Sequence, residues 1–99
     1  MKYIITESRL DNLIFKFLDT KLNGTKMFKG AYYDITLGFN GPTHGLIAWD
    51  APGRLFISTN LSGSVEDLFG IEELEAFKII GRYFEDRYDL EVIHYSPLY

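Results

Sequence analysis

Hydrophobic positions near the start of the chain repeat with the spacing of an α-helix. At 100° per residue, one face carries Leu10, Leu13, Ile14, Phe17 and Leu18. Thr6 and Ser8 are alternative N-caps for this helix, and Asn23-Gly24 is typical of a helix end. We therefore expect a helix that begins within two residues of position 7 and ends before residue 23. The apolar residues just before it can form an additional short strand.

Three segments in the middle of the chain are typical of strands. Residues 31–39 alternate between apolar and polar side chains, as in a half-buried strand. Residues 44–50 and 54–60 are short runs with large apolar side chains on both faces. Turn-forming residues separate the three segments: Asn40-Gly41-Pro42-Thr43 and Asp50-Ala51-Pro52-Gly53. Connections this short predict an antiparallel meander.

The last third of the chain predicts a second long helix and a final strand. Apolar positions over residues 72–88 have helical spacing, and residues 65–69 predict one helical turn that Gly70 interrupts. Residues 90–95 predict a strand that Pro97 stops.

The expected fold is a single α+β domain over residues 1–99 with the element order (β)αβββαβ. Each long helix carries one apolar stripe that must be covered. We therefore expect an antiparallel or mixed sheet of four to five strands with two helices packed on one face.

Composition narrows the class of protein. The chain is 46% hydrophobic and contains no cysteine, which excludes disulfide scaffolds, thiolate metal sites and cysteine nucleophiles. No His, Asp and Glu set has metal-site spacing, and no run is long enough to span a membrane. We expect a soluble cytoplasmic protein without a metal or a cofactor.

Charge is distributed unevenly along the chain. Residues 1–30 hold six basic and three acidic side chains, a net charge of +3. Residues 64–91 hold three basic and nine acidic side chains, a net charge of −6. Such polarity can support head-to-tail association or docking on a charged partner, although solvated helix faces of opposite sign also account for it.

Catalysis has one weak set of candidates in this sequence: His44, Asp34 and Asp50. A histidine beside a carboxylate can act as a general base, so a small-ligand-binding or hydrolytic domain is one alternative function. No nucleophile motif accompanies these residues. An ordinary hairpin histidine is therefore the simpler interpretation.

Aromatic side chains in the strands allow a second alternative, a single-stranded nucleic-acid binder. Bases could stack on Tyr32, Trp49 and Phe56, with Lys26 and Lys29 close to the phosphates. The formal net charge of −4 and the lack of a basic cluster argue against this function.

Excess apolar surface favours association instead. The strands over residues 44–50 and 54–60 are apolar on both faces, whereas two helices can cover one face only. Either a partner covers the second face or the sheet curls on itself. The candidate interface residues are Phe15, Leu22, Trp49, Phe56 and Ile79. We expect a non-enzymatic, self-associating module, with a homodimer favoured.

The opening segment also resembles a known group of sequences. The pattern Ile4-Ile5-Thr6-Glu7-Ser8-Arg9-Leu10, preceded by Lys2-Tyr3 and followed by Leu13-Ile14, is similar to the start of many small uncharacterised proteins of T4-like marine phages and of marine metagenomes. The resemblance covers at most the first fifth of the chain. It implies a viral or environmental origin, a location in the host cytoplasm if phage-encoded, and an accessory or structural role, and it supplies no catalytic residues.

Overall fold

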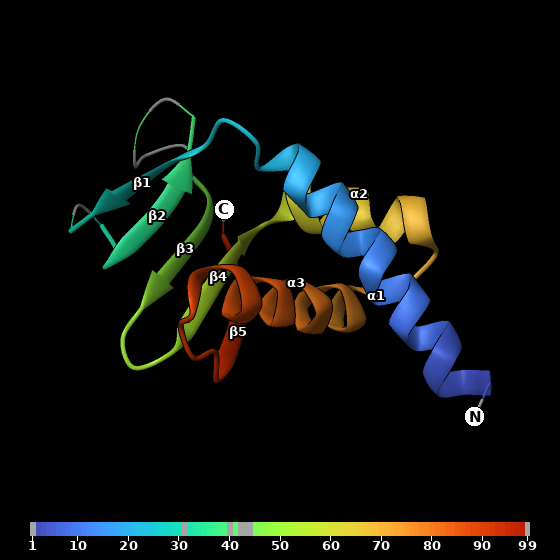
Figure 1. Ribbon diagram of the computed structural model, residues 1–99. Helices are drawn as coiled ribbons and strands as arrows, with labels where there is room; N and C mark the ends of the chain where they lie inside the picture. Colours follow the sequence, from blue (N-terminus) through green and yellow to red (C-terminus); the bar gives the residue numbers. More distant parts are fainter. Residues whose placement is uncertain (1, 31, 40, 42–44, 99) are drawn as a thin grey trace.

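The computed structural model describes residues 2–30, 32–39, 41 and 45–98, with side chains described from residue 9 onward. The elements in chain order are α1 (Lys2–Lys21), β1 (Lys26–Lys29), β2 (Ile35–Gly38), β3 (Gly45–Asp50), β4 (Arg54–Ser58), α2 (Thr59–Phe69), α3 (Glu73–Tyr88) and β5 (His94–Leu98). Figure 1 shows their arrangement. No described helix has both the length and the apolar character needed to cross a bilayer.

The five strands form one mixed sheet in the order β1-β2-β3-β4-β5. The first four are antiparallel neighbours, as expected of a meander, and β5 then joins parallel to β4, with Arg54 beside His94. A parallel neighbour needs a long crossover, and the two helices α2 and α3 provide it. The α+β class and the mixed sheet are therefore confirmed.

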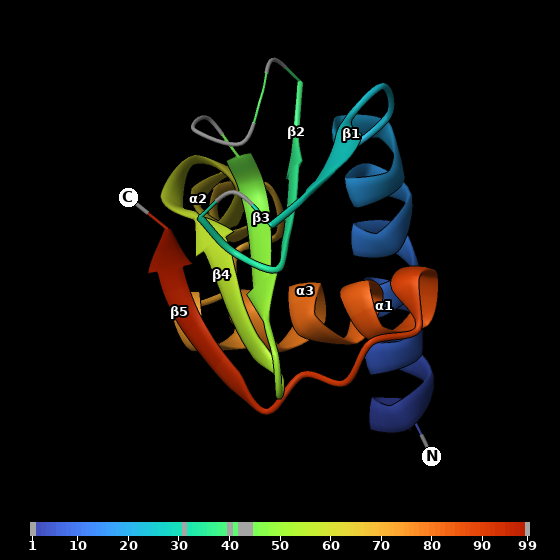
Figure 2. The same ribbon diagram turned by 90° about the vertical axis from the view of Figure 1, so that its left-hand side faces the viewer.

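One hydrophobic core joins the helices to one face of the sheet. Figure 2 shows α2 and α3 behind the sheet, with α1 alongside them. Leu55 and Ile57 of β4 are fully buried in this core together with Ile14 of α1 and Phe84 of α3. Because side chains alternate along a strand, the residue between the two, Phe56, lies on the opposite face.

The chain itself covers part of that opposite face. Figure 2 shows the connection between β1 and β2 passing in front of β3. The ring of Tyr33 in this connection packs against the ring of Phe56, with 4.8 Å between the ring centroids. Thr36 and Ala48 on the same face are each only 1% exposed. The segment that leads into β2 therefore covers part of this face, an arrangement that differs from both expected ones, a partner and a curled sheet.

The observed order is αββββααβ, with three helices where two were predicted. The first difference is at the start: residues 2–5 belong to α1 and form no strand, so neither Thr6 nor Ser8 caps the helix. The second is β1, a four-residue strand that the sequence analysis missed. Its sequence, Lys-Met-Phe-Lys, is too short to show a strand alternation.

The third difference is α2, which begins at Thr59 and is much longer than the single turn predicted over residues 65–69. Leu61, Val65 and Phe69 are spaced four residues apart, which is helical spacing. Gly63 and the serines around it disfavour a helix and obscure this pattern. Burial of Leu61 and Val65 in the core supplies the stability that local propensity lacks.

The remaining elements differ from the predictions mainly at their ends. The helix predicted over residues 72–88 is confirmed as α3. The last strand begins four residues later than predicted and continues through Pro97. Proline lacks an N–H, and an edge strand such as β5 tolerates it because one side of the strand has no partner to bond.

Candidate functional site

Asp34 and Asp50 form a reciprocal pair of hydrogen bonds where β2 begins and β3 ends. The backbone N–H of Asp34 donates to Oδ1 of Asp50 at 2.7 Å. The backbone N–H of Ala51 donates to Oδ2 of Asp34 at 2.8 Å. Each carboxylate therefore fixes the backbone of the neighbouring strand end.

This geometry gives the two candidate catalytic carboxylates a role in the fold. Asp side chains commonly accept hydrogen bonds from backbone N–H groups in turns. Asp34 is exposed and Asp50 is half-buried. His44, the third candidate, lies outside the described residues. Among the residues that the structure describes, no group of three or more His, Asp or Glu side chains could hold a metal ion.

Two of the five candidate interface residues are core residues of the monomer. Ile79 is fully buried and Leu22 is 6% exposed, and both belong to the main hydrophobic cluster. Neither offers surface to a partner. Leu22 packs in this core together with Ile14 and Leu18 of α1.

The other three candidates are half-buried and already have partners within the chain. The ring of Phe15 meets the ring of Tyr83 edge-on, and Phe56 lies against Tyr33. Trp49 faces the helices, and its indole Nε1–H donates to the backbone carbonyl of residue 91 at 2.9 Å. None of the three is among the strongly exposed apolar side chains of the structure.

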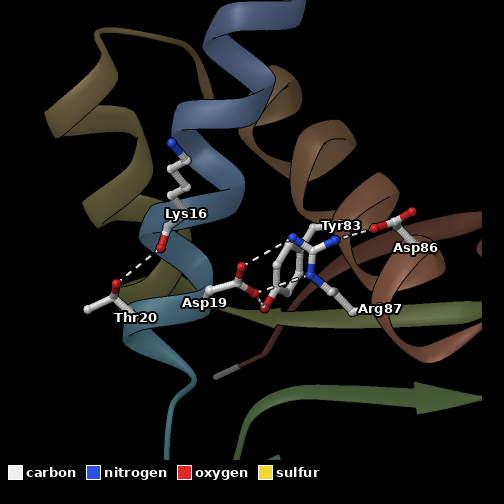
Figure 3. Close-up of polar contacts among 6 residues, drawn as sticks. All are labelled: Lys16, Asp19, Thr20, Tyr83, Asp86 and Arg87. Atoms are coloured by element: carbon white, nitrogen blue, oxygen red, sulfur yellow. Dashed lines mark hydrogen bonds and ion pairs between the residues drawn. The ribbon is translucent and has the colours of Figure 1, made fainter.

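The densest polar cluster joins α1 to α3 and consists of Asp19, Tyr83 and Arg87 (Figure 3). The phenolic hydroxyl of Tyr83 donates to Oδ1 of Asp19 at 2.6 Å. The guanidinium of Arg87 donates to both carboxylate oxygens, from Nε at 3.2 Å and from Nη2 at 3.1 Å. Arg87 also lies over the rings of Phe15 and Tyr83 and pairs with Asp86.

Hydrogen bonds and burial within the cluster keep the Asp19 carboxylate ionised and the Tyr83 hydroxyl protonated. The hydrogen bonds from Arg87 and then from Tyr83 lower the pKa of Asp19, so its carboxylate stays ionised. Burial, and then the hydrogen bond to Asp19, raise the pKa of Tyr83 well above its ordinary value. Tyr83 therefore keeps its proton and Asp19 accepts three hydrogen bonds. An ionised carboxylate that already accepts three hydrogen bonds is a brace between helices and a poor general base.

Sequence reasoning missed this cluster because its members are far apart along the chain. Asp19 falls on the polar side of the first helical wheel, where a solvated charge needs no explanation. Arg82 of α3 forms a second, similar bridge to Asp11 of α1 at 2.9 Å. Only the crossing of the two helices brings these pairs together.

Among the described side chains, seven large apolar ones are strongly exposed: Leu13, Met27, Tyr32, Phe39, Leu68, Leu74 and Ile93. Met27, Tyr32 and Phe39 lie on or beside the β1–β2 hairpin, with 42%, 69% and 48% of their surfaces exposed. Leu68 and Leu74 lie where α2 ends and α3 begins, with 64% and 61% exposed. These side chains are the surface features that the core does not explain.

Comparison with known protein families, curated proteins and solved structures finds no match to this chain.

Proposed function

We propose that this protein is a non-enzymatic interaction module that associates with further copies of itself. The observation that carries the proposal is the exposure of large apolar side chains in a chain of 99 residues. Leu68 and Leu74 are each more than half exposed where α2 ends and α3 begins, and apolar surface left uncovered at one place favours contact with a partner. The resemblance of the opening segment to small phage proteins supports an accessory or structural role.

The placement of the candidate catalytic residues favours this function over a hydrolase. Asp34 and Asp50 accept hydrogen bonds from backbone amides, which accounts for both residue types at these positions without a substrate. Nucleic-acid binding is supported less well, because Trp49 faces the helices and Tyr33 covers the ring of Phe56. Of the predicted stacking platform, Tyr32 remains strongly exposed.

Sedimentation velocity over a concentration series tests the proposal. We expect the sedimentation coefficient to rise with concentration into the high micromolar range, and light scattering to report a mass above that of one chain. A strictly monomeric species throughout the series would overturn the proposal. Fluorescence anisotropy with a labelled single-stranded oligonucleotide tests the alternative of nucleic-acid binding. Binding by such a protein would weaken strongly as the salt concentration rises.

A further inference from the structure

One end of the molecule presents a positively charged sheet edge. β1 is the outermost strand of the described sheet, and its residues Lys26, Met27 and Lys29 are exposed. No acidic residue occurs between Asp19 and Asp34 in the sequence. We call Lys26, Met27 and Lys29 the basic edge.

The opposite end presents exposed leucines surrounded by acidic side chains. Residues 65–77 form the end of α2, the connection and the start of α3, and they contain five acidic residues and no basic one. Leu68 and Leu74 are the exposed apolar groups of this segment. We call Leu68, Leu74 and the acidic residues Asp67, Glu73 and Glu75 the acidic corner.

The two surfaces cannot neutralise each other within one chain. Figure 1 shows β1 and the connection between α2 and α3 at opposite ends of the molecule, whose longest dimension is 44 Å. Salt screens exposed charges beyond about 8 Å at physiological ionic strength. Among the described side chains, the ion pairs involve Asp11, Asp19 and Asp86 with two arginines of α3, and none involves either surface.

We infer that the acidic corner of one copy docks on the basic edge of a second copy, so that the protein associates head to tail. This inference rests on the proposed function and specifies its geometry. Met27 and Lys29 lie on one face of the sheet and Lys26 on the other, so the two lysines flank the edge from both sides. In the docked pair, Met27 would supply apolar area for Leu68 and Leu74, and the lysines would meet the surrounding carboxylates. Charge complementarity selects the partner, since the corner is acidic overall, with five carboxylates against the exposed Lys78 one turn after Leu74, whereas the charged residues of the edge are both lysines.

Contacts between identical surfaces are disfavoured by the same charges. Antiparallel pairing of two β1 edges across a two-fold axis would bring lysines of both chains together, and like charges on paired strands are destabilising. Lysines on an edge strand are a recognised means of preventing such pairing. Two acidic corners would repel each other in the same way. A dimer formed head to tail leaves one basic edge and one acidic corner free, so further copies can add to form a ring or an open chain.

Charge exchange between the two surfaces tests the inference. The edge variant K26E/K29E and the corner variant D67K/E73K/E75K change exposed residues, and neither touches the core. In each variant both surfaces carry the same sign of charge. We expect at least a tenfold weakening of association for each variant alone, and recovery when the two are mixed at the same total concentration.

Two control variants accompany the test, and its outcomes distinguish a failure of self-association from a failure of the head-to-tail geometry. R54E and E91K reverse exposed charges at the start of β4 and in the connection to β5, and both variants should associate like the parent chain. If the parent chain itself is monomeric, the proposed function fails. If the parent associates but either surface variant associates equally well, or if mixing restores nothing, the head-to-tail geometry is overturned while self-association stands. Circular dichroism and thermal unfolding establish that each variant is folded.

Discussion

Tyr95 of β5 lies directly against Gly81 of α3, and its ring occupies the space that a side chain at residue 81 would need. The three heavy atoms nearest to an added Cβ are two ring carbons and the hydroxyl oxygen of Tyr95. A glycine in a helix interior costs about 1 kcal/mol relative to alanine. The close approach of β5 to the helix explains why glycine is nevertheless present.

Replacing Gly81 with alanine should destabilise the protein although alanine is the better helix former. We expect G81A to lose about 1–3 kcal/mol of unfolding free energy, because the added methyl group displaces the Tyr95 ring. In a Y95A background the same change should gain up to about 1 kcal/mol. Urea denaturation followed by the fluorescence of Trp49, the single tryptophan, measures both. An equal effect of G81A in both backgrounds would contradict the explanation.

The bond between Tyr83 and Asp19 should contribute more to stability than the neighbouring surface ion pair. D19A removes the acceptor of a hydroxyl on a residue that is only 3% exposed, and we expect a loss of about 1–2 kcal/mol. D86A removes another partner of Arg87 whose side chain is 58% exposed, and it should cost less than about 0.5 kcal/mol. Equal losses in the two variants, measured by urea denaturation, would argue against a brace between α1 and α3.

The same cluster predicts opposite pH effects at its two groups. The pKa of Tyr83 is raised in the folded state, so its contribution is complete below about pH 10 and declines as the pH rises further. The pKa of Asp19 is lowered in the folded state, so its contribution is present above about pH 4 and is lost as the pH falls through the folded-state value. We expect the stability difference between the parent and Y83F to shrink above pH 10. A difference that stays constant from neutral to alkaline pH would contradict the assignment.

The reciprocal bonds of Asp34 and Asp50 should matter for stability through their acceptor oxygens. D34A and D50A each remove an acceptor of a backbone N–H, and we expect a loss of about 1 kcal/mol for each. D34N and D50N keep an acceptor oxygen and should cost less than the alanine variants. Thermal unfolding compares the four proteins, and asparagine variants as unstable as the alanine variants would show that the charge, and not the hydrogen bond, is what matters.

Apolar periodicity predicts the elements that carry a clear apolar repeat within their own sequence. The helix α3 and the meander through β2, β3 and β4 follow directly from such patterns. The helix α2 does not, because Gly63 and nearby serines disfavour it locally and burial of Leu61 and Val65 outweighs them. The four residues of β1 form a strand because β2 offers hydrogen-bonding partners. A segment of four residues is too short for its own sequence to predict this pairing.

The polar contacts are even harder to predict from the sequence, because they form only when the helices pack together. Asp19 and Tyr83 are separated by 64 positions, and their bond needs the crossing of α1 over α3. The interface candidates were chosen by residue type, which cannot distinguish the buried Ile79 from an exposed leucine such as Leu74. Charge asymmetry was visible in the sequence, whereas the separation of the two charged surfaces required the fold.

The parallel pairing of β5 with β4 has a consequence for how the chain acquires its structure. The strands from β1 to β4 join through short connections, whereas β5 must close a loop that contains both α2 and α3. Closing a longer loop costs more conformational entropy, and distant pairings of this kind slow folding. During synthesis the meander can assemble while the residues of β5 are still missing. Until they arrive, β4 exposes one row of unpaired backbone groups, and the nascent chain is most prone to aggregation at that stage.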